Sequence, residues 1–255
     1  MNRWTFGAAG LMAGALISAA AGAEEKAAGS ATVSAWAEAS SAYVYRGNTL
    51  NEGWVVQPGM EVTGLPVLIG VWANWNGDTS KHDPTIRRGE ISQIDLYARY
   101  RLPFEKLSEH KLPIESSIGY AEYTYPGRPL DADRWTTVRV GGTCLLKPSL
   151  DVYYGVGGNA ENAWYAEAAI EHQIDLPKDW AVKASATVGY VHPDDGPDGF
   201  SHYTLSLGAG YAFCYASVTY VGQIDKNVLP TIASNEIGTG YDVSVYGTVG
   251  VSIDF

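Results

Sequence analysis

The sequence predicts an all-β protein, an antiparallel transmembrane β-barrel of about twelve strands with both termini in the periplasm. Three observations support this fold class: apolar and polar residues alternate along most of the chain, short turns alternate with long polar loops, and aromatic residues gather near the ends of the expected strands. Because two of the expected strands are short, a count of ten is also compatible with the pattern.

The composition excludes several other classes of protein. The chain has 255 residues, and its 28 acidic and 17 basic side chains give a net charge of −11. This acidity makes nucleic acid an unsuitable partner, because proteins bind a phosphate backbone through clustered Lys and Arg. The mean hydropathy is −0.10. No apolar run of about 20 residues follows the N-terminal region, so the sequence does not predict a helical membrane protein.

The N-terminal region has the pattern of a secretory signal peptide. Arg3 supplies a positive charge, residues 6–20 are apolar, and Ala21-Gly22-Ala23 forms a small-residue cleavage site. Cleavage there removes Arg3 and changes the net charge from −11 to −12. We therefore expect an exported protein of the bacterial outer membrane, with a signal peptide at residues 1–23, a short lead-in at 24–31 and a barrel domain at 32–255.

The alternation has a period of two residues, as expected for strands with one apolar face. It is clearest from Val243 to Phe255, where Val and Ile share one face and Ser, Thr, Gly, Tyr and Asp occupy the other. The expected strands are residues 32–45, 54–62, 67–75, 92–102, 114–124, 135–146, 151–156, 164–174, 180–191, 202–213, 216–221 and 243–255.

Alternation alone does not decide which face is inside. A soluble β-sandwich packs its apolar face in a core, whereas a membrane barrel turns that face to lipid. The aromatic residues favour the barrel because Trp and Tyr prefer membrane interfaces. The loops favour it as well, since short connections at residues 63–66 and 147–149 interleave with long ones at 76–89 and 192–201. An exported soluble sandwich that binds carbohydrate through its aromatic residues remains an alternative.

The last strand ends on Phe255, and in this it resembles the C-terminal strand by which outer-membrane barrels are recognised for insertion. The partners expected from this interpretation are the barrel-insertion machinery, outer-membrane lipid and lipopolysaccharide.

Charged residues on the polar faces of the strands are the candidates for the lumen wall. Six are acidic and five are basic, so we expect no strong ion selectivity. These side chains either line an open passage or satisfy one another in a narrow barrel. The candidates are Glu38, Arg46, Glu61, Asp95, Arg99, Arg101, Glu115, Arg139, Glu167, Glu171 and Lys183.

Reactive residues do not form a catalytic or metal-binding pattern. The five histidines are scattered, and only Ser201 and His202 are adjacent, although neighbouring strand residues point to opposite faces. The acidic loop at residues 192–199 lacks the spacing of a calcium-binding loop. Cys144 and Cys214 fall on strands that are not neighbours, which favours two small packing residues over a disulfide. We expect no enzyme activity, no cofactor and no metal.

The first hairpin carries a family resemblance. Ser41-Ala42-Tyr43-Val44-Tyr45-Arg46-Gly47, followed by Asn51-Glu52-Gly53 and Gln57-Pro58-Gly59, resembles the opening of the TorF-like porins, also called the Gcw_chp proteins. The motif residues are Tyr43, Tyr45, Arg46 and Gly47. The resemblance implies an outer-membrane barrel with the role of a porin.

Independently of this resemblance, the alternation places Arg46 inward at the top of the first strand, and Gly47 would begin the turn that follows. Arg46 then either helps to form the pore mouth or pairs with Glu38 or another carboxylate, and we favour the pairing. The function predicted for the chain is a channel for passive diffusion of small polar solutes, with a closed structural or scaffold barrel as the alternative.

Overall fold

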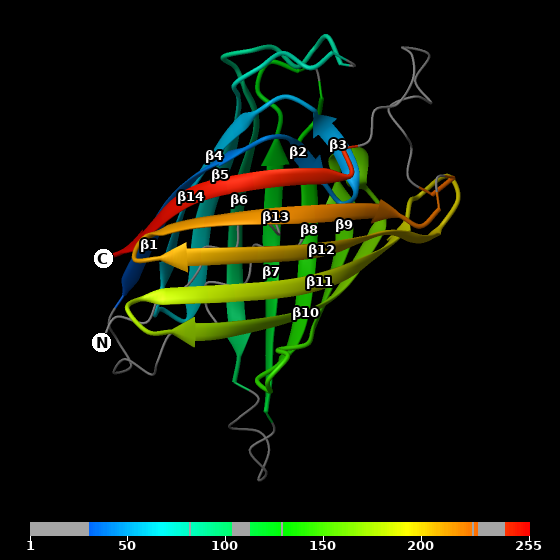
Figure 1. Ribbon diagram of the computed structural model, residues 1–255. Helices are drawn as coiled ribbons and strands as arrows, with labels where there is room; N and C mark the ends of the chain where they lie inside the picture. The colour runs from blue at the N-terminus through cyan, green and yellow to red at the C-terminus, as the bar shows by residue number, and fades with distance from the viewer. Residues whose placement is uncertain (1–30, 82, 104–112, 129, 226, 229–242) are drawn as a thin grey trace.

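The computed structural model is a closed antiparallel barrel in which twelve strands are paired among the described residues, as predicted (Figure 1). The structure describes residues 31–81, 83–103, 113–128, 130–225, 227–228 and 243–255. The expected signal peptide and most of the lead-in lie outside these residues. Within the described ranges, no helix has both the length and the apolar character needed to cross a membrane.

The barrel strands follow the predicted segments closely, apart from the first. They are β1 (Thr32–Ser40), β4 (Val55–Thr63), β5 (Val67–Asn76), β6 (Ile91–Leu102), β7 (Ile114–Thr124), β8 (Asp133–Gly142), β9 (Ser149–Gly157), β10 (Trp164–Leu176), β11 (Trp180–His192), β12 (Gly199–Tyr211), β13 (Cys214–Gln223) and β14 (Val245–Asp254). A single turn of 3-10 helix, η4 (Gly158–Ala160), follows β9.

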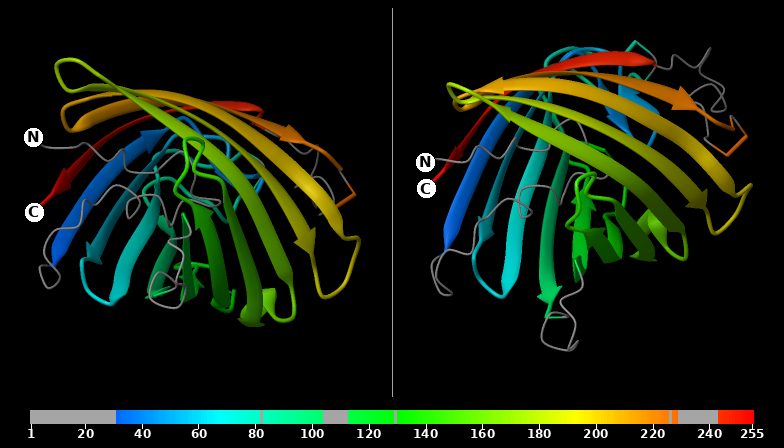
Figure 2. Two further views of the ribbon diagram at one scale, coloured as in Figure 1. Left: turned by 90° about the horizontal axis from the view of Figure 1, so that it is seen from below. Right: turned by 60° about the horizontal axis from the view of Figure 1, so that its bottom comes forward.

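Each barrel strand pairs with its neighbours along the chain, and the sheet closes where β1 meets β14. That seam runs in register from Ser34 opposite Asp254 to Ser40 opposite Thr248. On its other side β1 pairs directly with β4, up to Ser40 opposite Val55. The coloured strands in Figure 2 accordingly follow one another around a single interior.

The two faces of the barrel differ as the alternation predicts. On β12 the outward Leu205 and Leu207 are 51% and 61% exposed, while Thr204 and Ser206 between them are half-buried and face the lumen. Successive strand residues point to opposite faces, so this one alternation produces both an apolar exterior and a polar interior.

The prediction of one continuous first strand, residues 32–45, was wrong. β1 ends at Ser40, and a separate two-stranded hairpin follows, made of β2 (Tyr43–Tyr45) and β3 (Asn48–Asn51). Its turn is Arg46-Gly47, with φ of 49° and 81°. Two consecutive positive φ values are typical of a tight two-residue hairpin turn, which reverses the chain although the alternation continues.

The barrel has two distinct ends. We call the end with Thr32 and Asp254 the terminal end; the short turns β4–β5, β8–β9, β10–β11 and β12–β13 lie there. The connection between β6 and β7, residues 103–113, is also at the terminal end and is longer than these turns. The other end is the loop end, which carries the remaining connections, among them the long ones at residues 77–90 and 224–244. Cys144 and Cys214 lie in or beside terminal-end turns and are both free, but they are exposed rather than packed.

Candidate functional site

The hairpin β2–β3 lies inside the barrel and contacts lumen-facing residues on opposite walls. Tyr43 lies against Trp72 of β5, with ring centroids 5.7 Å apart, and its hydroxyl donates to Gln93 of β6 at 2.9 Å. At the tip, a Cβ added to Gly47 would lie 2.6 Å from the Cβ of His202 on β12. The family motif thus forms an element that crosses the lumen rather than the top of a wall strand.

Arg46, at the tip of the hairpin, is held by aromatic rings. Its side chain is buried, with 8% exposure. The guanidinium carbon lies 4.1 Å from the ring centre of Tyr165, 4.3 Å from Trp135, 4.8 Å from Tyr153 and 5.0 Å from Tyr45. A guanidinium over ring faces makes cation–π contacts, which are strongest where water is excluded. We call these four rings the aromatic cage.

The expected ion pair of Arg46 with Glu38 or a neighbouring carboxylate was wrong. Among the described residues, Arg46 makes no ion pair, and its Nε and Nη2 atoms are buried without a hydrogen-bond partner. The reason is its position: the turn carries the side chain toward β8, β9 and β10, and away from Glu38 on β1.

Packed side chains fill the lumen around the hairpin. Every barrel strand contributes at least one lumen-facing residue that is buried. We call this set the buried layer; it consists of Glu38, Gln57, Trp72, Asp95, Ala121, Thr137, Tyr153, Glu167, Thr187, His202, Thr219 and Thr248. The aromatic core of the molecule is therefore in the lumen, at the level of the hairpin.

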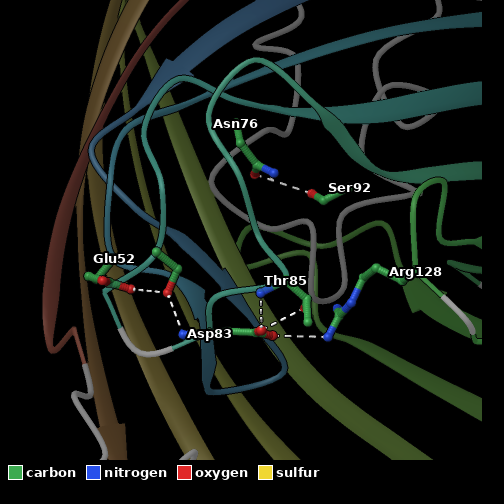
Figure 3. Close-up of polar contacts among 7 residues, drawn as sticks. Glu52, Asn76, Asp83, Thr85, Ser92 and Arg128 are labelled. Atoms are coloured by element: carbon green, nitrogen blue, oxygen red, sulfur yellow. Dashed lines mark hydrogen bonds and ion pairs between the residues drawn. The ribbon is translucent and has the colours of Figure 1, made fainter.

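A network of amides fixes the base of the hairpin to the wall. Asn51 of β3 donates to Asn76 at 3.2 Å, and Asn74 donates to the same Asn76 oxygen at 3.1 Å. Gln57 donates to Asn74 at 3.0 Å, and the hydroxyl of Ser92 donates to Asn76 at 3.3 Å (Figure 3). Buried amides need such partners, because an unmade hydrogen bond in the interior is costly.

The connection between β5 and β6 folds over the loop end. Ser80 donates to Glu52 at 2.8 Å, Thr85 donates to Asp83 through its amide and its hydroxyl, and Arg128 forms an ion pair with Asp83 at 3.0 Å (Figure 3). These contacts tie the loop to the residue that follows the hairpin and to the β7–β8 connection.

The β7–β8 connection is held by a further hydrogen bond, from the Tyr125 hydroxyl to Asp133 at 2.6 Å. Burial, and after it this hydrogen bond, raise the pKa of Tyr125 above its usual value. The phenol therefore remains a neutral donor over the physiological range of pH.

Four of the predicted lumen carboxylates bind phenols or an amide. The hydroxyl of Tyr97 donates to Glu61 at 2.7 Å, and Tyr165 donates to Glu167 at 2.6 Å. The Tyr215 hydroxyl donates to Glu38, and Gln93 donates to Asp95 at 2.8 Å. These partners were not predicted from the sequence, although each acceptor and donor lies on a lumen-facing strand position.

Toward the terminal end, the predicted charges form ion pairs. Arg139 pairs with Asp151 at 2.9 Å, and Lys183 pairs with Glu171 at 2.9 Å. Arg101 pairs with Glu115 at 3.0 Å in a more exposed position, and Arg99 is half-buried on β6. Asp151 was absent from the predicted set, although its spacing from Tyr153 and Gly155 places all three on one face of β9.

Ser201 and His202 lie together, contrary to the expectation that adjacent strand residues point apart. The Ser201 Oγ lies 3.0 Å from His202 Nδ1, and both side chains are fully buried. The register between β11 and β12 shifts at Gly189/Tyr190, beside His202, and this irregularity lets both residues turn inward. Within the described part of the chain, no group of three or more His, Cys, Asp or Glu residues has a metal-binding arrangement.

A protein-family model matches residues 24–244, and that family is described as bacterial protein of unknown function (Gcw_chp). The chain belongs to the Gcw_chp family. The match covers the hairpin and nearly the whole barrel, so it extends far beyond the motif that suggested it. The chain matches no protein with a curated description.

Solved structures similar to this Gcw_chp protein are membrane barrels of low sequence identity. The anion-selective porin from Comamonas acidovorans has a TM-score of 0.35 at 11% identity, over 88% of this chain and 98% of that one. Wzi of Escherichia coli, an outer-membrane carbohydrate-binding β-barrel involved in capsule assembly, has a TM-score of 0.34 at 10% identity. That match covers 79% of this chain and 52% of Wzi. The translocator domain of NalP from Neisseria meningitidis has a TM-score of 0.38 at 11% identity, over 88% of each chain.

Proposed function

We propose that this Gcw_chp protein is an outer-membrane barrel that lets small polar solutes pass through its lumen. The observation that carries the proposal is the division of side chains between the two faces. Carboxylates, guanidiniums, amides and hydroxyls face inward, whereas exposed Leu, Val and Ile residues face outward. A soluble β-sandwich would instead have an aliphatic interior. In this proposal the protein is not an enzyme and needs no cofactor.

Aromatic pairs on the outward face support a membrane location. Tyr154 and Trp164 lie 4.6 Å apart near the loop end, and Trp180 and Tyr211 lie 5.1 Å apart near the terminal end. Trp and Tyr prefer the two interfaces of a bilayer, where one part of the ring system is in an apolar environment and another is hydrated.

We assign the loop end to the cell exterior and the terminal end to the periplasm. Outer-membrane barrels place long loops outside and short turns in the periplasm, so both termini would be periplasmic. The outer surface would then contact lipid and lipopolysaccharide, and the strand that ends in Phe255 would engage the insertion machinery.

The charges in the lumen favour weak ion selectivity. The described ion pairs toward the terminal end place a cation beside each anion, so little net charge of either sign faces a passing solute. Because the buried layer narrows the passage, we expect flux far below that of an open barrel of the same size.

A closed structural barrel is the second candidate, and the buried layer itself favours it. If the packed lumen never opens, the protein would reinforce the membrane or hold a partner without transport. The two candidates have the same fold and differ only in whether solute crosses.

The test is single-channel current in a planar bilayer, together with solute uptake by proteoliposomes. The protein is purified in detergent and shown to be folded by its heat-dependent shift on a gel, with protein-free liposomes as the control. We expect brief current steps that scale with salt and show little preference between cations and anions. A folded barrel with no flux, in both the native form and the form without residues 43–51, would contradict the channel and favour the structural barrel.

A further inference from the structure

We infer that the hairpin β2–β3 is a movable stopper, and that Arg46 is the latch that holds it in the lumen. This inference rests on the proposed channel function, which it extends to regulation of the same lumen. The observation behind it is the juxtaposition of the Arg46-Gly47 tip with the aromatic cage and His202 on the far wall.

The hairpin can leave the lumen without breaking a barrel strand pair. β1 pairs with β4 up to Ser40 opposite Val55, so residues 41–54 form an insertion between two strands that are already joined. β2 and β3 pair only with each other and form a separate sheet. Withdrawal of the hairpin therefore leaves all twelve strands of the closed barrel paired.

Backbone and side-chain hydrogen bonds hold the base of the hairpin, whereas ring contacts and packing hold its tip. At the base, the Ser41 amide donates to the Gly247 carbonyl at 2.9 Å, and the Val243 amide donates to Thr49 Oγ1 at 2.8 Å. At the tip, the described contacts include the cation–π contacts of Arg46, the edge-on ring contact of Tyr45 with Tyr123, and the packing of Gly47 on His202. A hinge at the base and a side-chain latch at the tip follow from this difference.

Arg46 makes both favourable and unfavourable interactions in the aromatic cage, so the hairpin can leave the lumen and return to it. Arg46 gains the ring faces of the cage, but its Nε and Nη2 atoms are buried without an acceptor. On leaving the lumen, the guanidinium would lose the rings and regain water. A buried ion pair would have held the tip more firmly, because breaking it would leave a carboxylate unpaired in the lumen.

Two independent readouts test the latch. The first is the open probability in single-channel records of the native protein, Arg46→Ala, and a variant in which residues 43–51 are replaced by Gly-Gly. The second is the labelling rate of Thr49→Cys by a membrane-impermeant thiol reagent, in a background with Cys144→Ser and Cys214→Ser. Thr49 is 1% exposed, so its thiol reacts only when the hairpin moves.

The matched control is Arg87→Ala. Arg87 lies exposed in the β5–β6 connection and forms none of the described hydrogen bonds, ion pairs or ring contacts of the hairpin, so this change removes the same charge without altering the latch. All variants are first checked for the heat-dependent gel shift of a folded barrel.

We expect Arg46→Ala to raise both open probability and labelling rate about tenfold over the native protein and Arg87→Ala, a change that corresponds to about 1.4 kcal/mol. The hairpin-deleted variant should remain open.

Equal labelling of Thr49→Cys with and without Arg46 would overturn the latch, whatever the currents. Equal currents from the native and hairpin-deleted proteins would overturn the stopper but leave the channel intact. Faster labelling without current in any variant would support a movable hairpin and contradict the channel.

Discussion

The lumen contacts fall into two halves that are held together by different interactions. In the first, which we call the aromatic half, a guanidinium lies among aromatic rings, and carboxylates accept hydrogen bonds from phenols. In the second, which we call the charged half, carboxylates pair directly with Arg or Lys. The aromatic half depends on shape and fit around an inserted element, whereas the charged half depends on charge. The lumen charges identified in the sequence therefore have two distinct structural roles.

The largest expected effect comes from disturbing the fit at the hairpin tip. Gly47→Ala places a Cβ 2.6 Å from the Cβ of His202 and forces a side chain onto a φ of 81°. Crowding and backbone strain together should lower the free energy of unfolding by about 3 kcal/mol. Urea unfolding of the protein in lipid vesicles measures this loss.

Gly89→Ala is the matched control for that change. Gly89 has a φ of 84°, but nothing lies within 4 Å of an added Cβ. Gly89→Ala should therefore lower the free energy of unfolding only through backbone strain, by about 1 kcal/mol. If the two substitutions cost the same, packing against His202 does not hold the hairpin, and the contrast between the halves fails.

Breaking the best-buried ion pair of the charged half should lower the free energy of unfolding by a smaller amount. Asp151→Asn keeps the shape of the side chain but removes the charge that faces Arg139, and the Asp151 side chain is only 4% exposed. Loss of a charged hydrogen bond in this position should cost about 2 kcal/mol. The urea midpoint is the readout, and an unchanged midpoint would mean that charge does not hold this half together.

A test of the same kind removes one phenol from the aromatic half. Tyr97→Phe deletes the hydroxyl that donates to Glu61 but keeps the ring that packs over Gly70. We expect a loss of about 1 kcal/mol, typical of a single hydrogen bond. Added salt should leave this loss nearly unchanged, since a buried neutral donor is screened little; a strong dependence on salt would show that the site is hydrated.

The smallest effect belongs to the exposed pair. Arg101 and Glu115 are 60% and 36% exposed, so Arg101→Gln should cost at most about 0.5 kcal/mol. Even this loss should disappear in high salt, because exposed charges are screened. A loss as large as that of Asp151→Asn would mean that exposure does not separate the two pairs.

Most of the barrel could be predicted from sequence, since strand alternation is a local property. The residues of β12 and β14 show their inward and outward faces without any knowledge of neighbours. The hairpin could not be predicted, because Tyr43 and Tyr45 continue the alternation of β1 although the chain bends at Ser41 and Ala42, and because the turn of the hairpin places Arg46 at a positive φ. Such a conformation at an arginine leaves little trace in the residue pattern.

The candidate site was predictable in its members but not in its pairings. Alternation placed Glu61 and Glu167 inward, yet their phenol partners depend on interstrand register and on side-chain reach, which one sequence does not reveal. The same limit applies to Arg46, because three of the four rings of its cage come from strands far along the chain. Asp151 was missed because it stands at the very start of its expected strand.

The position of the hairpin has a consequence for the order of assembly. Ser40 and Thr248 are hydrogen-bonded across the β1–β14 seam at 2.7 Å, and Ser41, at the base of the hairpin, bonds to Gly247 beside them. The first and last strands of the sheet therefore meet where the insertion begins. The hairpin joins β1 to β4 at the loop end, so it can turn inward through that end before or after the seam closes, and closure of the seam does not have to wait for it. Seam closure joins residues more than 200 positions apart, so we expect it to be the slow final step of biogenesis.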